Sequence, residues 1–475
     1  MSQILVVDLD GTLLRSDILF EAMLHHIKQG LGSTLQIPLW LLGGKASLKE
    51  RLAFNAHLDV TILPYNEEII ALLQQARQDN RYIVMATASH RIYADRISAH
   101  LGLFDRVIAT EQGINLSSRT KCARLISEFG HKGFDYIGNS HDDIPVLEAA
   151  EHAYLADPDF GVENRARTNG NVAGVFQSRT GVFRSWVKAL RPHQWMKNLL
   201  IFIPLLAAHH FTDVALIAQA ILAFIFFSLC ASSGYLINDL LDLESDRHHP
   251  RKRNRPLASG NLPIQLGIVS APLLFLVALT GSLLLLPVTF SISLGIYYVL
   301  TLAYSQKLKQ IMMVDTIVLA GLYTVRIIAG AYACSLVPTF WILAFSMVLF
   351  LSLAMVKRYA ELYDARSLGE TGQTRGRGYF SSDLDVIANL GSSAGYLSVL
   401  VLALYIQDAK TIQMYRHHEL IWLACPILLF WISRVWMIAH RGLMHDDPVL
   451  FAVKDRISLL TGAAFATVFI LAIIL

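Results

Sequence analysis

The sequence predicts two joined domains of different fold class. Residues 1–175 are expected to form an α/β domain with a parallel sheet and a small helical cap, and residues 191–475 an all-α membrane domain of nine helices, with 176–190 as a linker. The chain is 54% hydrophobic and only 16% charged, and its long apolar runs come after Val187. A helix that crosses a bilayer needs about 20 apolar residues, so these runs predict membrane spans. Before Val187, short apolar runs alternate with helical patterns, which is typical of a parallel sheet covered by helices.

Polar side chains follow the expected strands of the α/β domain. The strands are expected at Ile4–Val7, Tyr82–Ala86 and Tyr136–Ile137. Ligands of parallel sheets bind at the carboxyl ends of the strands. The segments at those ends are residues 8–14 (DLDGTLL) after the first strand, Thr87 at the end of the second, Lys121 at a helix start and residues 138–143 (GNSHDD) after another strand.

This ordered set resembles the haloacid dehalogenase phosphatase superfamily over nearly all of residues 1–175. The resemblance implies that Asp8 attacks a phosphate monoester, while Asp10 protonates the leaving oxygen and later activates water. It implies that Thr12, Thr87 and Lys121 contact the substrate phosphate. It also implies Mg²⁺ as cofactor, with Asp8, Asp10, Asn139 and Asp143 as its expected ligands.

Asn139 departs from the pattern of this superfamily, in which many members have Asp at the same place. An amide oxygen still binds Mg²⁺, but with one negative charge less. Two interpretations therefore stay open: an active phosphatase domain, or a retained scaffold with a regulatory role.

The expected cap, residues 13–65, contains an unusually apolar segment at 35–42 (LQIPLWLL). Such a segment fits either the core of the cap or contact with a bilayer surface, and the sequence does not decide between them.

Nine apolar segments are expected to span the membrane: 199–208, 214–237, 264–286, 288–303, 314–333, 338–356, 386–406, 419–433 and 457–475. The first is short and is interrupted by Pro192 and Pro204. With nine spans, the loops on one side carry sixteen Lys and Arg residues, and those on the other carry only Lys410 and Arg416. By the positive-inside rule we expect a multi-pass protein of the inner (cytoplasmic) membrane, with the N-terminal domain in the cytoplasm and the C-terminus outside. The small net charge of +3 argues against nucleic acid as a partner.

An acidic motif lies at the end of the second span. Asp239, Asp242 and Asp246 have the spacing i, i+3, i+7, which places them on one face of a continuing helix. Three neighbouring carboxylates repel one another unless cations lie between them, and Mg²⁺ suits such a set because it prefers oxygen ligands and keeps substrate phosphates in its shell. The alternative is a solvated acidic helix end. Aspartates this close to hydrocarbon are costly, which favours a functional site.

The pattern Asn-Asp-x-x-Asp-x-x-x-Asp at 238–246, together with nine spans, resembles the UbiA superfamily of intramembrane transferases, over about residues 185–475. The resemblance implies a cavity in which motifs at the ends of the second and sixth helices hold Mg²⁺ and a diphosphate, with Asp242 and Asp246 as catalytic residues. At the sixth helix this chain has Lys357, Arg358 and Glu361 instead of a second Asp-rich motif. Two extra cations suit a substrate with more phosphate than an allylic diphosphate.

Arg326 lies eleven residues after Asp315 in the fifth span, about 16 Å deeper at the α-helical rise. A cation at this depth needs an anion or a group of carbonyls, and we favour a ligand over a structural ion pair. The residues of this domain expected to contact substrate are Lys197, Asn198, Asn238, Arg253, Arg255, Tyr304, Lys307, Lys309, Arg326, Lys357, Arg358 and Glu361.

Several motifs resemble the polyprenyl-phosphate phosphoribosyltransferase branch of this superfamily. They are residues 191–198 (RPHQWMKN), 304–309 (YSQKLK), 357–362 (KRYAEL) and 445–450 (HDDPVL). The resemblance implies transfer of 5-phosphoribose from phosphoribosyl diphosphate to a polyprenyl phosphate. The product carries a phosphomonoester, which the attached domain would hydrolyse. Two rival functions stay open: an aromatic prenyltransferase that uses a polyprenyl diphosphate, and a non-catalytic membrane anchor or sensor.

Overall fold

The computed structural model describes residues 3–111, 115–179, 181–210, 212–367, 369, 377–444 and 447–474. The chain forms two compact units. The first comprises residues 1–190 and 235–271, and the second comprises 191–234 and 272–475. The helices α11 (Val214–Leu241) and α13 (Ile264–Leu285) each contribute residues to both units.

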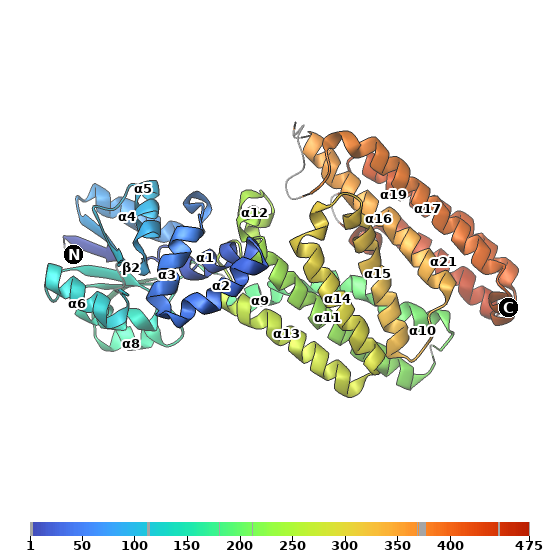
Figure 1. Ribbon diagram of the computed structural model, residues 1–475, viewed down its shortest axis with the longest axis horizontal. Coiled ribbons are helices and arrows are strands. Elements are labelled where there is room, and N and C mark those ends of the chain that lie inside the picture. The colour runs from blue at the N-terminus through green and yellow to red at the C-terminus, as the bar shows by residue number, and fades with distance from the viewer. Residues whose placement is uncertain are drawn as a thin grey trace. The chain divides into compact units, whose positions relative to one another are not determined.

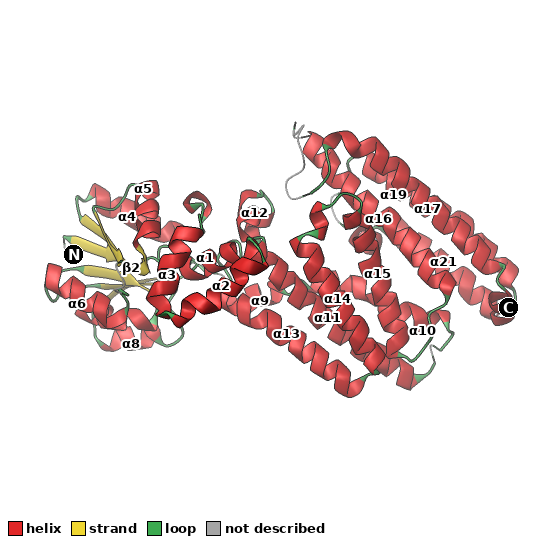
Figure 2. Cartoon of the chain, in the orientation of Figure 1, coloured by secondary structure: helices red, strands yellow, loops and turns green. Residues whose placement is uncertain are grey.

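A six-stranded sheet forms the centre of the first unit, with the order β3-β2-β1-β4-β5-β6 and parallel pairing throughout (Figure 2). Its strands are β1 Ile4–Val7, β2 Tyr82–His90, β3 Arg106–Thr110, β4 Asp135–Gly138, β5 Ala153–Ala156 and β6 Val172–Phe176. Successive residues of β1 point to opposite faces, so Leu5 and Val7 pack in one apolar cluster and Val6 in another. Burial on both faces explains the unbroken apolar run of this strand. The predicted α/β fold is confirmed.

Helices cover the sheet and form the cap (Figure 1). The other elements that lie wholly in the first unit are α1 Ile18–Lys28, α2 Leu31–Leu42, α3 Gly44–Asn55, η1 Val60–Ile62, α4 Glu67–Gln78, α5 Arg91–Leu101, α6 Ser118–Phe129, η2 His141–Asp143, α7 Ile144–Ala149, α8 Val162–Thr168, α9 Val182–Ala189, α12 Leu243–His248 and η4 Lys252–Asn254. The apolar segment 35–42 lies in α2, where Ile37 is buried in the cap while Leu35, Leu39 and Leu42 are exposed. Cap packing therefore accounts for only part of its apolar character.

The second unit is helical. The elements not yet given are η3 Pro192–Phe202, α10 Ile203–Ala207, α14 Val288–Gln306, η5 Leu308–Gln310, α15 Val314–Ala333, α16 Phe340–Ser367, η6 Ser381–Asp383, α17 Leu384–Ile406, α18 Ala409–Met414, η7 His418–Leu423, α19 Ala424–His440, α20 Pro448–Lys454 and α21 Arg456–Ile474. Helices α16, α17, α19 and α21 pack on one another in succession (Figure 1).

Eight helices of the described residues are long and apolar enough to cross a membrane, against the nine predicted from the sequence. The ninth is not confirmed, because the expected span 199–208 is divided between the 3₁₀ segment η3 and the short helix α10. Pro192 and Pro204 stand at the N-terminal ends of these two elements. Proline lacks the amide that a helix interior requires, which breaks the segment into two.

Close helix packing in the second unit depends on Gly330 of α15. A Cβ atom at this position would lie 2.0 Å from the carbonyl oxygen of Ile201 in η3. Gly321 of the same helix has open space around it. The two glycines therefore make a matched pair.

We expect Gly330→Ala to lower the thermal stability of the detergent-solubilised protein, because overpacking at a backbone contact costs about 1–3 kcal/mol. Gly321→Ala is the control, and should leave stability unchanged or raise it slightly, since alanine favours a helix by about 1 kcal/mol over glycine. Melting temperatures followed by size-exclusion chromatography after heating would compare the two. Equal effects of both substitutions would contradict the close contact.

Candidate functional sites

The loop after β1 brings Asp8 to the carboxyl end of the sheet. Its backbone amide donates to the carbonyl of Ile137 in the neighbouring strand β4 at 3.0 Å, which fixes the start of the loop. Gly11 then turns the chain with φ +77°, and its missing side chain leaves room for Asn139, whose Nδ2 would lie 2.4 Å from a Cβ atom there. Thr12 donates to Oδ1 of Asn139 at 3.2 Å. The two expected motifs, 8–14 and 138–143, thus meet.

Lys121 lies between two buried carboxylates of this site. From the start of α6 its Nζ atom reaches Oδ1 of Asp8 at 2.8 Å, Oδ1 of Asp143 at 2.9 Å and the hydroxyl of Tyr136 at 3.0 Å. Burial raises the pKa of Asp8 to about 8, although the Lys121 charge opposes the shift. Burial alone would also raise the pKa of Asp143, but the Lys121 charge and its hydrogen bonds hold it below its usual value. Tyr136 was predicted as part of a strand but not as a residue of the site.

Asp10 faces the second strand. Its Oδ2 accepts from Ser89 at 2.6 Å and from Thr87 at 3.4 Å, and its Oδ1 accepts from the amide of Ile18 at 2.8 Å. Burial raises the pKa of Asp10, which favours the protonated carboxyl that a general acid needs. Ser89 was missed by the sequence analysis, because β2 extends beyond Ala86 to His90.

Lys49 of the cap helix α3 is a further cation near this site. Its Nζ donates to the carbonyl of Ala88 at 2.7 Å and to Oδ1 of Asn115 at 2.9 Å. Burial lowers the pKa of Lys49, against the raising effect of the charges of Asp10 and Asp17. No local pattern predicts this contact, since the direction in which a cap helix points is a tertiary property.

The residues of the sheet-edge site, which are Asp8, Asp10, Thr12, Thr87, Lys121, Asn139 and Asp143, suit a divalent cation in their donor chemistry. Three carboxylates and an amide oxygen are hard ligands of the kind Mg²⁺ prefers. The raised pKa of Asp8 means that its charge needs more compensation than Lys121 supplies, which a bound cation would provide.

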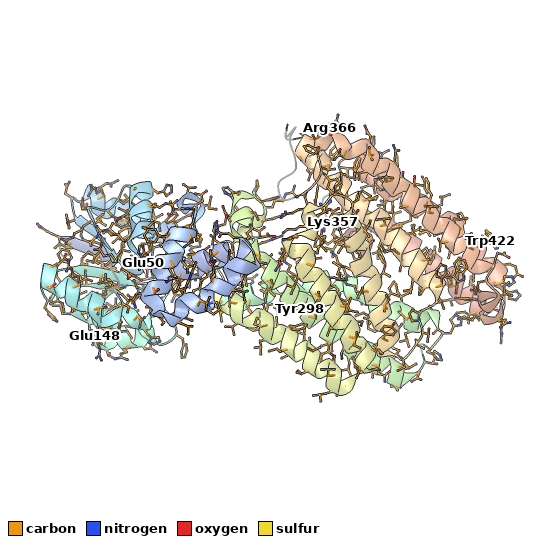
Figure 3. All side chains as sticks on the ribbon, in the orientation of Figure 1. Glu50, Glu148, Tyr298, Lys357, Arg366 and Trp422 are labelled. Carbon is orange, nitrogen blue, oxygen red and sulfur yellow. The ribbon has the colours of Figure 1, made fainter. Side chains whose placement is uncertain are left out.

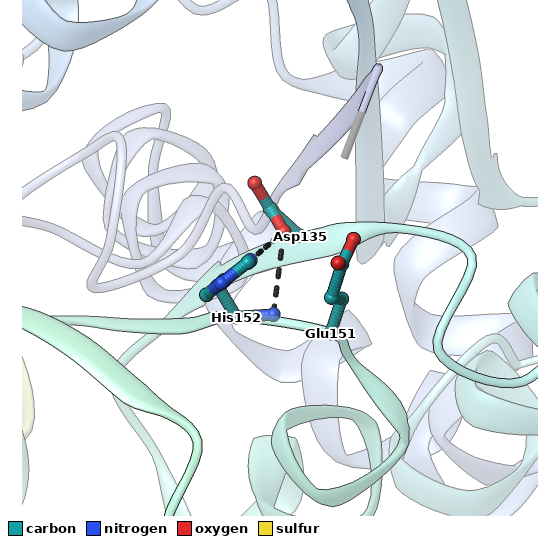
Figure 4. Close-up of side chains that lie close together, drawn as sticks. All are labelled: Asp135, Glu151 and His152. Atoms are coloured by element: carbon teal, nitrogen blue, oxygen red, sulfur yellow. Dashed lines mark hydrogen bonds and ion pairs between the residues drawn. The ribbon is translucent and has the colours of Figure 1, made fainter. Parts of the chain in front are cut away.

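A second group of possible metal ligands, Asp135, Glu151 and His152, lies at the other end of β4 (Figure 4). Asp135 accepts there from Arg81 at 2.5 Å and from the Nδ1 atom of His152 at 3.0 Å. These bonds occupy its carboxylate and join β4 to the start of β2. We interpret the group as a structural ion-pair cluster.

The acidic motif has a different geometry from the predicted one. Helix α11 ends at Leu241, and Asp242 stands outside it as the N-cap of the short helix α12, with φ −98° and ψ 11°. The prediction of one continuous helical face is therefore wrong. The break still brings Asp239 and Asp246 together, because Nη1 of Arg255 lies 3.1 Å from Oδ1 of Asp239 and 2.5 Å from Oδ2 of Asp246.

We call Asp239, Asp246 and Arg255 the acidic loop site. Two other predicted residues, Asn238 and Arg253, lie in the same part of the chain. Asn238 is half-buried in the last turn of α11, and Arg253 is exposed in η4. Burial raises the pKa of Asp246, although the charge of Arg255 opposes it. Paired acids that share one guanidinium in a polar loop are a suitable donor set for Mg²⁺, which would replace that cation.

Two lysines of the second unit meet at one carboxylate. Oδ2 of Asp447 accepts from Lys197 of η3 at 2.8 Å and from Lys357 of α16 at 3.2 Å, and its Oδ1 accepts from Tyr323 at 3.2 Å. Figure 3 labels Lys357 on its helix. Burial would raise the pKa of Asp447, but the two lysine charges outweigh burial and hold the pKa well below its usual range. This lysine–aspartate cluster concentrates positive charge at one point, as a phosphate site requires.

Arg326 is buried in α15 among aromatic rings. Its guanidinium donates to Oδ1 of Asn198 at 2.9 Å, to the hydroxyl of Tyr297 at 3.0 Å and to the carbonyl of Leu322 at 2.5 Å. It also lies 5.4 Å from the ring centre of Phe227. The structure thus gives both Arg326 and Asn198 structural partners.

Arg358 faces inward. Its Nη2 lies 2.8 Å from Oδ2 of Asp315, which also accepts from Tyr379, and its Nη1 pairs with Glu361. Glu361 lies near Arg377 as well, at 3.8 Å. Arg358 is 1% exposed, so its contacts position α16 on α15.

Tyr304, Lys307 and Lys309 lie in the last turn of α14 and in the segment that follows it. Arg377, which was not predicted, donates to the hydroxyl of Tyr304 at 3.1 Å. Lys307 is exposed and Lys309 is half-buried in the turn after α14. His445 and Asp446 of the expected motif lie outside the described residues.

Comparison with known proteins matches both halves of the chain. The model of the UbiA prenyltransferase family matches residues 199–448, and that of haloacid dehalogenase-like hydrolases matches residues 5–148. The uncharacterized protein y4nM of Sinorhizobium fredii is 35% identical over 98% of this chain and 90% of its own length. Nodulation protein NoeC of Azorhizobium caulinodans is 38% identical over 61% of this chain and 94% of its own. The decaprenyl-phosphate phosphoribosyltransferase of Mycobacterium tuberculosis is 33% identical over 62% of this chain and 96% of its own.

We expect Lys121→Met to destabilise the chain by about 3–5 kcal/mol, because it leaves two buried carboxylates without their cation. Adding Asp143→Asn should restore part of this loss, since the repulsion between the carboxylates is removed. Thermal unfolding of both variants in detergent measures the effect. If the double variant were as unstable as the single one, the ion pairs would not carry the stability of this site.

Proposed function

Since the chain belongs to the UbiA prenyltransferase family and carries a haloacid dehalogenase-like domain, we propose that it transfers 5-phosphoribose from phosphoribosyl diphosphate to a polyprenyl phosphate and then dephosphorylates the product. The observation that carries this proposal is the lysine–aspartate cluster. Lys357 lies at the sixth-helix position where many members of the superfamily have a second Asp-rich motif, and Lys197 binds the same carboxylate, so a substrate rich in phosphate suits this pair. The identity to a decaprenyl-phosphate phosphoribosyltransferase supports the same substrate class.

In the transfer step, the bond between the anomeric carbon and the diphosphate oxygen breaks, and its electron pair leaves with the diphosphate. An oxygen of the lipid phosphate forms the new bond to that carbon. Bound at Asp239 and Asp246, Mg²⁺ would neutralise charge on the leaving diphosphate. Lys197 and Lys357 would bind phosphate oxygens. The lipid phosphate is already ionised, so no general base is needed, and orientation supplies much of the rate.

In the hydrolytic step, Oδ of Asp8 attacks the phosphorus of the ribose 5-phosphate and Asp10 donates its proton to the leaving ribose oxygen. Asp10 then takes a proton from the water that cleaves the acyl phosphate. Lys121 holds Asp8 in position through its bond at 2.8 Å. Lys49, with its ammonium group near Asp10, would bind the oxygens of the incoming phosphate.

We also propose that both reactions occur at the cytoplasmic face of the inner membrane, with the C-terminus outside. The excess of lysine and arginine in one set of loops supports this orientation. A reporter fused after Leu475 tests it, because an active cytoplasmic reporter there would contradict the orientation.

The central experiment incubates purified protein with Mg²⁺, labelled phosphoribosyl diphosphate and polyprenyl phosphate, followed by extraction of labelled lipid. Label in the lipid phase supports the transferase. Turnover of an allylic diphosphate with an aromatic acceptor, and none of phosphoribosyl diphosphate, would favour the aromatic prenyltransferase instead.

Asp246→Asn should reduce transfer by at least about 100-fold. The substitution weakens the binding of a metal that would supply several kcal/mol of transition-state stabilisation. Glu244→Gln is the matched control, as Glu244 lies in the same short helix, half-buried and paired with His25. Initial rates at saturating Mg²⁺ measure the difference. Near-normal transfer by Asp246→Asn would remove this residue from the metal site.

Asp8→Asn should leave transfer intact and cause the phosphorylated lipid to accumulate, because the nucleophile of the second reaction is lost. Wild type should release inorganic phosphate and yield the ribosyl lipid. Mass spectrometry of the extracted lipids separates the two products by one phosphate. If wild type also stops at the phosphorylated lipid, the attached domain does not act on this product and the transferase proposal stands alone.

A further inference from the structure

Helix α2 of the cap presents a row of exposed leucines. Leu35, Leu39 and Leu42 are 71%, 66% and 85% exposed. Their spacing of four and three residues places them on one face of the helix, while Ile37 on another face is buried in the cap. We call these three residues the leucine stripe. Leaving them in water forgoes the burial of three large apolar side chains, so a partner surface is expected.

The composition around the stripe favours a lipid surface as that partner. The sequence has no Asp, Glu, Lys or Arg between Lys28, the last residue of α1, and Lys45 in the first turn of α3, and both of these flanking lysines are exposed. A helix with an uncharged apolar face flanked by lysines suits the boundary between acyl chains and anionic headgroups. A partner protein would gain less from this pattern, because the leucine side chains of the stripe make no hydrogen bonds.

Contacts within the first unit connect the cap to the end of a membrane span. Leu24, His25 and Lys28 of α1 line the same small cavity as Leu240 and Leu241, the last two residues of α11. Helix α11 is one of the eight candidate spans, so its last turn lies near the bilayer surface. Helix α1 therefore packs at the level where the chain leaves the membrane.

Two sets of polar contacts fix this arrangement. Arg247 of α12 binds Glu21 of α1 through two hydrogen bonds, at 2.6 and 3.1 Å, and both side chains are buried. His26 of α1 binds Gln36 of α2 at 3.2 Å, and its ring lies 4.8 Å from the ring of Trp40. The helix that carries the stripe is thus held to α1, and α1 to α12, the short helix that follows α11.

We propose that the leucine stripe lies in the interfacial layer of the bilayer and docks the cap of the α/β domain onto the membrane surface. The docking requires no enzymatic activity of either domain, so its test is independent of the proposed function. Three leucines at the interface would bury apolar area that water otherwise contacts.

The test places an environment-sensitive fluorophore at Leu39→Cys of the full chain, in a background whose four cysteines are replaced by alanine. The control is Phe160→Cys, because Phe160 is a fully exposed apolar residue of the same domain but stands outside the cap. Each protein is reconstituted as a single copy in nanodiscs that contain anionic lipid. Melting temperatures equal to that of the cysteine-free parent exclude misfolding of the cap.

We expect lipids with a spin label near the headgroup to quench the Leu39 site at least about twofold, and iodide in the buffer to quench it little. The Phe160 site should respond in the opposite way. Equal quenching of both sites by iodide would overturn the proposal, since α2 would then face water. Protection of the Leu39 site from iodide without quenching by lipid would also overturn it, because protein would then cover the stripe.

Discussion

The ammonium group of Lys121 holds Asp8 and Asp143 at 2.8 and 2.9 Å, and the carboxyl end of the sheet depends on this contact. Two carboxylates cannot be buried side by side without a cation, because desolvation and their mutual repulsion both oppose it. With Lys121 in place, Asp143 stays charged and also accepts from the amides of Asn139 and Ser140. One ion pair therefore fixes the loop after β4 against the loop after β1.

The need of a buried charge for an opposite charge also explains two other polar clusters of the chain. Arg255 joins Asp239 to Asp246, and Asp447 joins Lys197 to Lys357. These clusters are opposite in composition, with two acids and one base in the first, and two bases and one acid in the second. The excess of carboxylates in the first cluster suits a cation, and the excess of ammonium groups in the second suits an anion.

The sequence predicted the parts of this structure that depend on local pattern. Alternation and apolar runs located the parallel sheet, and the motifs near Asp8 and Asp143 lie together because the carboxyl ends of adjacent parallel strands share one edge. Contacts that are set by tertiary packing could not be predicted from the sequence. The break of α11 at Asp242, the reach of Lys49 from the cap and the meeting of Lys197 with Asp447, 250 residues apart, have no local signature. The first expected span, 199–208, is not confirmed for a local reason, since Pro204 stands at the point where it divides into η3 and α10.

Arg247 connects the acidic loop to the cap within the first unit. This residue directly follows Asp246, and its guanidinium is buried against Glu21, which also accepts from Ser16 in the loop that begins at Asp8. Adjacent residues of α12 thus bind Arg255 of the acidic loop and Glu21 of helix α1. A buried bidentate pair of this kind tolerates little change in geometry, because separating it leaves two uncompensated charges. The C-terminal part of α12 is therefore held by two neighbouring ion pairs, Asp246 with Arg255 and Arg247 with Glu21.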